Sequence, residues 1–442
     1  MLRGLIKESF QPQVKSERNT TMSVRLSTEV LVIGAGPAGA SAAYWAAKSG
    51  RMVVLLEKDV IPRDKVCGDA LTPKAVGHLN DMQIDVTKST FHQHHGLKMT
   101  ADGQSIELRW PTDHDHPSHG LVIRRRSLDE ILVAHAKEAG AQVWTGVEVT
   151  DPVVEHGHLR GCRASGTGSG TGPDGEIEVR ARFVVIADGP LSPFGRALGT
   201  ARTRQYAQGV AMRGYFPSPQ HSEKMIESVF DLRDSSGQQL PGYGWVFPLG
   251  DGTVNTGVGL LSHHHGNDPR SIQDLFDEWL LQIPKFWDVD IENIESEPQG
   301  GRLPMGASVR PRSGPNWVVV GDAAGSVNPF NGDGIEPALN NGKLAASVID
   351  NAIDTGDGLA LRQYEKELAS KYDHYYRLGR LATKALGRPG LMRRFTRLGI
   401  QSRVLTELVM RISTNLVNND AGGTESVYEI GKVVARLIPD RD

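Results

Sequence analysis

The sequence predicts an α/β fold in which a parallel-sheet domain carries an inserted antiparallel sheet and is followed by a C-terminal helical region. Three observations predict this. Residues 29–57 have the pattern of a buried strand, a glycine-rich turn, a helix and a second buried strand. A third apolar strand, from Trp317, ends in another glycine-rich turn before a helix. Between these segments, residues 209–259 alternate apolar and polar side chains in short runs, which is typical of a half-buried antiparallel sheet.

The first turn has the spacing GxGxxG after the apolar run Val30–Ile33. The first glycine permits the tight turn, the second lets a pyrophosphate approach the backbone, and the third lets the helix pack close to its strand. Proline suits the first turn of a helix because no amide hydrogen is needed there. The free N–H groups of this helix start favour a phosphate. We therefore assign to cofactor binding Gly34, Gly36, Pro37, Ala38 and Gly39.

The second apolar strand, Met52–Leu56, ends on Glu57 and is followed by Lys58. A carboxylate at this point can accept hydrogen bonds from the hydroxyls of an adenosine ribose, and it would repel a 2′-phosphate. The unit therefore predicts FAD or NAD and excludes NADP. We include Glu57 and Lys58 in the cofactor site.

The third strand, Trp317–Val320, delivers an acid to a turn rich in Gly and Asn. An acid at a strand end can hold a polyol hydroxyl, and the following helix start can face a pyrophosphate or a flavin edge. This segment resembles the "GD" fingerprint of FAD-dependent oxidoreductases of the p-hydroxybenzoate hydroxylase type. The resemblance implies FAD, with the aspartate on its ribitol. The residues implied in binding are Gly321, Asp322, Pro329, Gly332, Gly334 and Ile335.

Further segments resemble the same superfamily. In "RRSLD", Arg125 stands four residues before Asp129 and precedes a helix expected over Leu128–Ala139. "FVVIADGP" carries an Asp-Gly pair, although Asp-Gly after a strand is also a common turn. The residues that the resemblance adds to the flavin site are Arg125, Val149, Asp188 and Gly189.

The predicted architecture is a Rossmann-like FAD-binding domain with an inserted antiparallel β-sheet substrate domain and a C-terminal helical region. We expect a disordered leader over residues 1–28, with the true start of translation at Met22. We place the discontinuous FAD-binding domain at 29–208 and 298–355, the sheet domain at 209–297 and the helical region at 356–442. Ser165–Gly175 is expected to be a hairpin tip, so no second nucleotide fold is available for an electron donor, whether NAD(P)H or another reductant.

The composition is that of a soluble globular protein. Of 442 residues, 39% are hydrophobic and 23% charged, and the formal net charge of −3 argues against a nucleic-acid partner. The two cysteines are too few for a disulfide framework, which fits a reducing cytoplasm. No apolar run approaches the roughly 18 residues of a membrane-spanning helix. The composition leaves the oligomeric state open.

Two further segments resemble one particular family within this superfamily. "PRDKVCGDALTP" and "GYGWVFPLGDGTVNTGVGL" resemble the CGD/G and YxWxFP…GxG signatures of the geranylgeranyl reductase family. The resemblance implies an FAD-dependent reductase that saturates an isoprene double bond in a prenylated lipid. The menaquinone-reducing branch is the most similar, with geranylgeranyl-glycerophospholipid or geranylgeranyl diphosphate as alternative substrates. It also implies that Cys67, Gly68 and Asp69 lie beside the flavin.

The substrate slot is expected at aromatic side chains. Alternation puts Tyr243, Trp245 and Phe247 on one face of a strand, which is either the pocket or the core. The family resemblance favours the pocket, with Tyr215 as a fourth member. We expect Cys67, Tyr243 and Trp245 to be catalytic, while Cys67 alone could be a proton donor, a redox switch or a small buried residue.

Histidines cluster in the sequence, but without the paired spacing of metal ligands on one element. We expect them in solvated loops and predict no metal. They are His92, His94, His95, His114, His116, His119 and His263 to His265.

The C-terminal region carries a local charge asymmetry. Between residues 377 and 411 nine basic residues are interleaved with apolar ones and accompanied by one acid, Glu407. Such a stretch suits either the anionic inner face of the cell membrane or a solvated helix face packed on the flavin domain. The basic residues are Arg377, Arg380, Lys384, Arg388, Arg393, Arg394, Arg397, Arg403 and Arg411.

Rival functions share the flavin fold. An aromatic monooxygenase also begins with reduced flavin, so it stays an alternative. Flavin-dependent halogenases carry WxWxIP where this chain has Tyr243, Trp245 and Phe247, so two signature residues are missing. A non-enzymatic electron carrier at the membrane is the third possibility.

Overall fold

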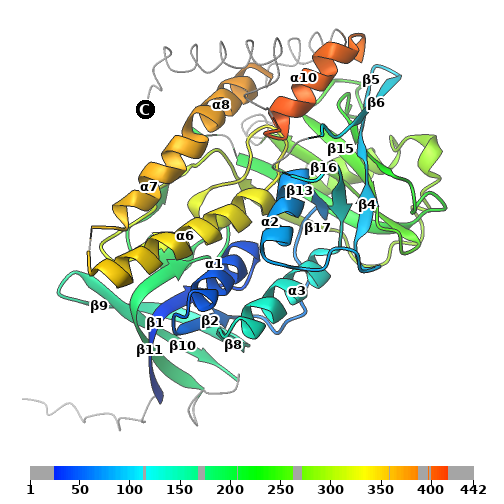
Figure 1. Cartoon of the computed structure of the whole chain (residues 1–442). Coiled ribbons are helices and arrows are strands. Elements are labelled where there is room, and N and C mark those ends of the chain that lie inside the picture. The colour runs from blue at the N-terminus through cyan, green and yellow to red at the C-terminus, as the bar shows by residue number, and fades with distance from the viewer. Residues whose placement is uncertain are drawn as a thin grey trace, which may run out of the picture.

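Two seven-stranded sheets organise the molecule in the computed structural model (Figure 1). The structure describes residues 24–112, 116–167, 175–206, 208–261, 271–357, 359–386, 397 and 400–416. The central strands of each sheet are largely buried, and the space between the sheets holds the candidate site described below.

The first sheet has the strand order β8-β2-β1-β11-β10-β9, with β19 paired to β11. β1, β2, β8, β11 and β19 are parallel, and β9 and β10 form an antiparallel extension. Because Ile33 of β1 lies beside both Leu56 and Ile186, the carboxyl ends of these strands meet at one edge. The bounds are β1 Val24–Ile33, β2 Val53–Glu57, β8 Gln142–Thr145, β9 Val147–Glu155, β10 His158–Gly166, β11 Glu176–Ile186 and β19 Trp317–Val319.

The first strand is longer than the sequence suggests. β1 begins at Val24, because Val24 already pairs with Ile177 of β11, so the leader expected over residues 1–28 is wrong for its last five positions, 24–28. Residues 1–23, including the suspected start at Met22, lie outside the described residues.

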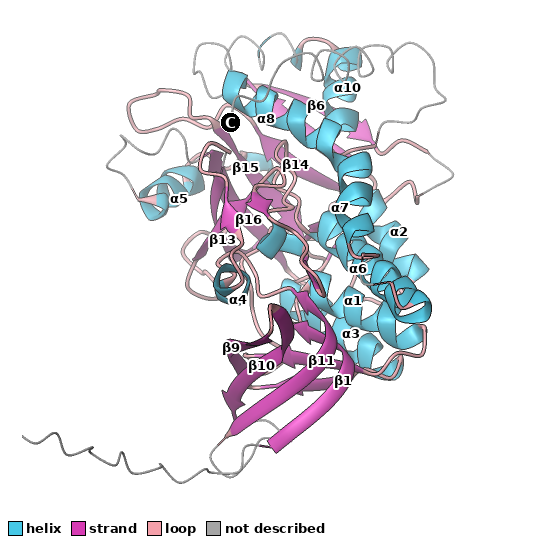
Figure 2. Ribbon diagram, turned by 90° about the vertical axis from the view of Figure 1, so that its left-hand side faces the viewer, coloured by secondary structure: helices cyan, strands magenta, loops and turns pink. Residues whose placement is uncertain are grey.

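Helices cover one face of this sheet, as Figure 2 shows from the side. They are α1 (Pro37–Lys48), α3 (Arg125–Glu138) and α6 (Ile335–Thr355). The Ser41 hydroxyl donates to the Leu339 carbonyl at 2.7 Å, and a Cβ on Gly342 would overlap the backbone of Ala38. The close packing of α1 on α6 therefore brings two segments about 300 residues apart in the chain to one edge of the sheet.

The second sheet has the order β17-β13-β16-β15-β14-β5-β6. The strands of this sheet do not all lie within the insertion expected at 209–297. β5 and β6 come from the segment assigned to the FAD-binding domain, and β17 begins after residue 297. The sheet is mixed, since β14 pairs with β5 in parallel. The bounds are β5 Gly96–Ala101, β6 Gln104–Arg109, β13 Gln208–Pro217, β14 Met225–Val229, β15 Gly242–Pro248, β16 Thr253–Leu261 and β17 Gln299–Pro304.

Both faces of this sheet are covered in its central strands, so the expected half-buried sheet is incorrect. On the outer face α5 (Ile272–Leu280) places Trp279 and Phe276 against Val246 and Val258. The Trp279 indole donates to the Thr256 hydroxyl at 2.9 Å. The opposite face turns toward the first sheet.

A small sheet joins the two large ones and holds the first histidine cluster. It consists of β3 (Ala70–Leu71), β7 (Gly120–Val122) and β4 (His92–His94). Both His92 and His94 are buried, which contradicts the solvated loop expected for them. His94 accepts a hydrogen bond from the Trp110 indole at 3.2 Å, and burial lowers its pKa to about 3.

Among the described residues no group of three or more potential ligands could hold a metal ion. His116 is also buried, whereas His114 and His263 to His265 lie outside the described residues.

The C-terminal region is helical where it is described, with α7 (Arg362–Leu368), α8 (His374–Leu386) and α10 (Arg403–Ser413). The Tyr376 hydroxyl donates to the Ser326 carbonyl at 2.6 Å, which ties α8 to the turn between β19 and α6. Figure 1 shows α8 and α10 at the end of the molecule that carries β5 and β6. The remaining short elements are α2 Pro73–Asp81, α4 Pro193–Ala197, β12 Ala201–Arg202, β18 Val309–Arg310, and single turns at Lys285–Trp287, Gly321–Ala324 and Ala369–Asp373.

Candidate active site

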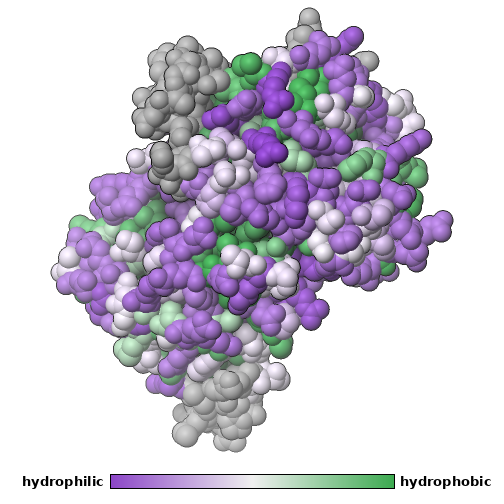
Figure 3. All heavy atoms as spheres, turned by 45° about the vertical axis from the view of Figure 1, so that its right-hand side comes forward, coloured by the Kyte–Doolittle hydropathy of each residue, from purple (hydrophilic) through white to green (hydrophobic). Residues whose placement is uncertain are grey.

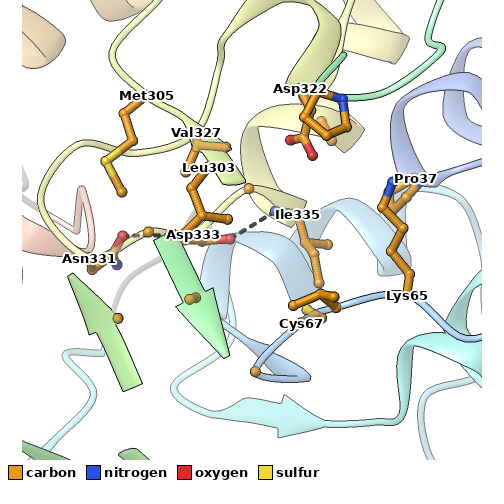
Figure 4. A pocket seen from close by; sticks show the side chains of 18 of the residues that line it. Pro37, Lys65, Cys67, Leu303, Met305, Asp322, Val327, Asn331, Asp333 and Ile335 are labelled. Carbon is orange, nitrogen blue, oxygen red and sulfur yellow. Dashed lines mark hydrogen bonds between the residues drawn. The ribbon is translucent and has the colours of Figure 1, made fainter. Parts of the chain in front are cut away.

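One cavity of about 920 Å³ extends from the carboxyl edge of the first sheet to the inner face of the second. Its two ends differ in chemistry. The end at the first sheet is lined by glycine turns and charged side chains, and the end at the second sheet by aromatic and aliphatic ones. Figure 4 shows the middle, where Cys67, Asp333 and Ile335 stand between the polar residues Lys65 and Asp322 and the apolar residues Leu303 and Met305.

The β1–α1 turn forms the polar end. Gly34 has φ +96°, and a Cβ there would overlap the carbonyl of Ala187. A Cβ on Gly39 would overlap the carbonyl of Gly34, so this glycine is required by helix packing. A Cβ on Gly36 would meet no protein atom within 4 Å, so its backbone faces open space. The turn therefore leaves a cradle that a pyrophosphate can approach.

Glu57 stands at the wall beside this cradle. One of its oxygens accepts the Ala35 amide at 2.8 Å, and Arg63 lies 3.3 Å away. Burial alone would raise the pKa of Glu57, but Arg63 and two backbone amides hold it below its usual value. The carboxylate stays ionised and can accept ribose hydroxyls. Arg63, which also pairs with Asp129 at 2.9 Å, was missed by sequence reasoning.

Most of the residues predicted for cofactor binding line the cavity. Gly39 and Gly321 do not. Gly39 supports packing, and Gly321, with φ +60°, would bring a Cβ to 2.8 Å from that of Ala38. Those that do line it are Gly34, Gly36, Pro37, Ala38, Glu57, Lys58, Cys67, Gly68, Asp69, Arg125, Val149, Asp188, Gly189, Asp322, Pro329, Gly332, Gly334 and Ile335.

Three further charged residues, Lys65, Asp322 and Asp188, line the polar end of the cavity. Burial lowers the pKa of Lys65, although the nearby charge of Asp322 acts to raise it. One oxygen of Asp188 accepts the Phe194 amide at 3.0 Å, while the other is buried without a hydrogen-bond partner among the described residues. Burial also raises the pKa of Asp188. An orphaned acceptor at a cavity wall fits a ligand that carries hydroxyl groups.

Asp69 anchors the CGD loop. It is fully buried at φ +66°. Its carboxylate accepts the Arg125 amide at 3.0 Å, the Tyr215 hydroxyl at 2.7 Å and the Asn255 amide group at 2.9 Å. Burial raises the pKa of Asp69 to about 6. Tyr215 does not line the cavity, because its hydroxyl is bound to Asp69 behind the cavity wall.

Asn255 joins this loop to the aromatic wall. Its amide also donates to the Cys67 carbonyl at 2.9 Å, and its oxygen accepts the Trp245 indole at 2.9 Å. Burial raises the pKa of the Cys67 thiol to about 11, so the thiol stays protonated near neutral pH. The buried Asn255 side chain therefore fixes the position of the CGD loop relative to the aromatic wall. Asn255 could not be predicted from the sequence, because a single amide in a strand has no distinctive pattern.

The aromatic wall faces the cavity. Tyr243, Trp245 and Phe247 line it with ring centroids 6.0 and 6.1 Å apart, and a Cβ on Gly68 would lie 3.1 Å from the Phe247 ring. The Tyr243 hydroxyl donates to the Asn331 carbonyl at 2.6 Å. Around this wall the apolar end is completed by Leu97, Met99, Ile226, Phe230, Leu303, Met305, Thr406 and Val409.

FAD fits the polar end of this cavity. The β1–α1 turn offers an open cradle, ionised Glu57 stands beside it, and Asp188 has an orphaned oxygen. The apolar end has no comparable set of polar groups and suits a hydrocarbon.

Comparison with known proteins agrees with this arrangement. The family model described as FAD binding domain matches residues 27–372. The chain is 34% identical to a menaquinone reductase of Mycobacterium tuberculosis, covering 95% of this chain and 99% of that protein. It is 35% identical to a menaquinone reductase of Mycolicibacterium smegmatis, with 93% and 98% covered.

More distant relatives act on other lipids. The chain is 28% identical to digeranylgeranylglycerophospholipid reductase 2 of Methanopyrus kandleri, covering 80% of this chain and 86% of that protein. Among solved structures, a geranylgeranyl bacteriochlorophyll reductase-like protein of Thermoplasma acidophilum matches with a TM-score of 0.76 at 23% identity, covering 92% of this chain and 100% of that one. The chain therefore belongs to the geranylgeranyl reductase family of FAD-dependent oxidoreductases.

Proposed function

We propose that this flavoenzyme saturates an isoprene double bond in the prenyl tail of menaquinone. The observation that carries the proposal is the single cavity whose polar end fits FAD and whose other end is a largely apolar chamber. The choice of menaquinone rests on the two mycobacterial relatives, which match over nearly the whole chain. A geranylgeranyl-glycerophospholipid or geranylgeranyl diphosphate is the alternative, since the more distant relatives include lipid reductases of the first kind.

The chemistry demands a dry site. An isolated trisubstituted alkene has no carbonyl to polarise it, so reduction needs a hydride equivalent together with a proton. Reduced FAD supplies the hydride equivalent. The chain must exclude water, orient the alkene and stabilise cationic character at carbon. The faces of Trp245 and Tyr243 suit this last task, because aromatic rings attract cations.

We assign the site residues as follows. The β1–α1 turn and Glu57 hold the adenosine diphosphate part of FAD, and Asp322 and Asp188 take its polyol hydroxyls. Cys67 and Gly68 form the wall beside the flavin ring, where the protonated thiol is a weak hydrogen-bond donor. Trp245 and Phe247 form the substrate wall, and Tyr215 supports it from behind through Asp69.

We also propose that the end with α8 and α10 meets an anionic membrane surface. Ala382 and Thr383 of α8 and Val409 of α10 line the apolar end, so a tail entering here would pass between these helices. Val404 is 71% exposed. Figure 3 shows apolar residues at this end beside polar ones. No helix in the described part of the chain is both long and apolar enough to cross a bilayer.

The test is anaerobic incubation of the chemically reduced holoprotein with menaquinone and, separately, with a geranylgeranylated glycerophospholipid, followed by mass spectrometry. We expect a gain of two hydrogens on menaquinone. Gain on the second lipid alone would overturn the substrate, and no gain on either lipid, with hydroxylated product in air, would indicate a monooxygenase. Flotation of the holoprotein with anionic but not neutral vesicles tests the membrane contact.

A further inference from the structure

Four ionisable groups line the cavity near the meeting of its two ends: Cys67, Asp69, Tyr243 and Asp333. The proton for alkene reduction must come from a group that faces the cavity and can be reprotonated from solvent. We propose that Asp333 is this proton donor and that Glu336 and His78 recharge it. This inference rests on the proposed prenyl reductase function and adds a catalytic residue to it.

Asp333 lies at the start of α6, in the turn that touches the aromatic wall. The neighbouring Asn331 carbonyl accepts the Tyr243 hydroxyl at 2.6 Å, and a Cβ on Gly332 would lie 3.8 Å from that hydroxyl. Figure 4 shows Asp333 beside Ile335, across from Cys67. Asp333 therefore stands where the flavin turn and the substrate wall come together.

The carboxyl of Asp333 is held in place from both sides. One oxygen accepts the Ile335 amide at 2.9 Å, and the other lies 3.3 Å from the Thr72 hydroxyl. Its side chain is partly exposed, and since it lines the cavity, a ligand can reach it. Its pKa is raised to about 6 by burial and by the charge of Glu336. A carboxyl with that pKa can hold a proton near neutral pH and release it.

A chain of polar groups leads from Asp333 to the surface. Glu336, in the first turn of α6, is the next acid in the sequence. Its backbone amide donates to an Asp333 oxygen at 3.4 Å, and its carboxylate is close enough for its charge to act on the Asp333 carboxyl. A Glu336 oxygen lies 3.5 Å from His78 Nε2, and the His78 side chain is 17% exposed. The Tyr372 hydroxyl donates to the same oxygen of Glu336 at 3.1 Å. Solvent protons can thus reach Glu336 without crossing the apolar end.

The other three groups are less suited. Burial raises the pKa of the Cys67 thiol to about 11, and that of the Tyr243 hydroxyl is raised further. Both are weak acids that would regain a proton easily but give it up slowly. Asp69 has a pKa of about 6, but its carboxylate is closed off by Arg125, Tyr215 and Asn255 and has no exposed surface.

In the proposed step, one alkene carbon takes a hydride equivalent, with its two electrons, from reduced FAD, and the other takes a proton from Asp333. The π bond is lost, two C–H bonds form, FAD is left oxidised and Asp333 is left as a carboxylate. A proton from solvent then passes through His78 and Glu336 to Asp333. The charged or titratable groups that act on Asp333 or Glu336 from neighbouring elements are Tyr243, His78, Lys74, Lys371, Tyr372 and Tyr376.

The test compares four variants of the FAD-loaded protein: Asp333→Asn, Glu336→Gln, Asp69→Asn and Asp274→Asn. Asp274 is the matched control, because it caps the start of α5 and does not line the cavity. Chemically reduced protein is mixed anaerobically with menaquinone, and reoxidation of the flavin is followed by absorbance in a single turnover. FAD content and quenching of tryptophan fluorescence by the lipid report binding separately.

We expect Asp333→Asn to bind FAD and menaquinone normally and to reoxidise about 100-fold more slowly or worse. The wild-type rate should fall as pH rises through about 6, because only protonated Asp333 can donate. Glu336→Gln should move this fall to lower pH by roughly one unit, since it removes a like charge. A wild-type rate retained by Asp333→Asn, or a loss seen in Asp69→Asn instead, would overturn the proposal.

An infrared difference spectrum gives a second readout that needs no turnover. Wild-type holoprotein at pH 5 should show a protonated carboxyl band that Asp333→Asn lacks and Asp69→Asn retains, and the absence of this band from the wild type would count against Asp333. If Asp333→Asn does not retain FAD, this band and the pH shift in Glu336→Gln decide whether Asp333 is the proton donor. If the wild type reduces neither menaquinone nor a geranylgeranylated lipid, the proposed function itself fails.

Discussion

The two ends of the cavity are built in different ways. The polar end is made from short turns that follow parallel strands, and each turn carries its functional residues within a few positions of one another. The apolar end is assembled from β5, β14, β15, β17, α8 and α10, each of which contributes one to three side chains. The polar end that fits FAD is therefore a local property of the sequence, and the proposed substrate chamber is a property of the whole fold.

The largest expected effect on stability comes from a substitution in the polar end. Gly39→Ala should cost about 3 kcal/mol of unfolding free energy or abolish folding, because the new Cβ would overlap the Gly34 carbonyl. Gly36→Ala is the matched control, since its Cβ meets no protein atom. It should fold normally and lose FAD affinity. Urea unfolding and FAD titration measure both, and equal stability of the two variants would contradict the different roles given to these glycines.

The second effect concerns the anchor between the two ends. The pKa of Asp69 is raised from its usual 3.8 to about 6, so the unfolded chain binds fewer protons than the folded one between these values. Stability from this group is fully present below pH 4 and is lost as pH rises through about 6.

Relative to Asp69→Asn, wild-type unfolding free energy should thus fall by about 2–3 kcal/mol between pH 4 and pH 7. Urea unfolding of both proteins across this range measures the difference. A difference that stays constant with pH would show that Asp69 titrates at its ordinary value.

A smaller effect is expected in the aromatic wall. Trp245→Phe removes the indole donor and leaves the Asn255 oxygen unpaired, which should cost about 1–2 kcal/mol and loosen the Cys67 loop. Trp45→Phe, on α1 outside the cavity, loses packing on the core but should leave the flavin absorbance spectrum unchanged. Thermal unfolding and the flavin absorbance spectrum report the two effects, and identical behaviour of the variants would argue against the link through Asn255.

The substitution that should change stability least should change the preference for substrate tail length most clearly. Val409→Trp adds volume to the apolar end, so it should favour short prenyl tails over long ones while leaving FAD binding unchanged. Val404→Trp, five residues earlier on the same helix and 71% exposed, should leave the preference as it is. Competition between short- and long-tailed menaquinones measures the preference.

Most residues that the sequence assigns to the cofactor line the polar end of the cavity, because the motifs there are local. The strand, turn and acid at Gly34 to Glu57 have a spacing that few other structures require. Arg63 and Lys65 were missed, since basic residues in a loop have no periodicity that indicates where they point. Gly39 and Gly321 were assigned to the cofactor, although the backbone packing they permit is within the protein.

The apolar end was harder to predict. Alternation indicated that Tyr243, Trp245 and Phe247 share a face, but not what that face meets. β5 and β6 were missed as members of the second sheet because β5, which joins this hairpin to the sheet, pairs with β14 more than 100 residues away. The buried His94 was expected in a loop, since nothing local indicates that Trp110 will cover it.

The most direct test of the account is a crystal structure of the holoprotein with FAD and a short-tailed menaquinone. We expect the flavin ring against Cys67 and Gly68, and the prenyl tail along Trp245 and Phe247 toward Val409. A tail bound outside this chamber, or a quinone ring stacked in it with the tail in solvent, would contradict the division of the cavity into a cofactor end and a tail end.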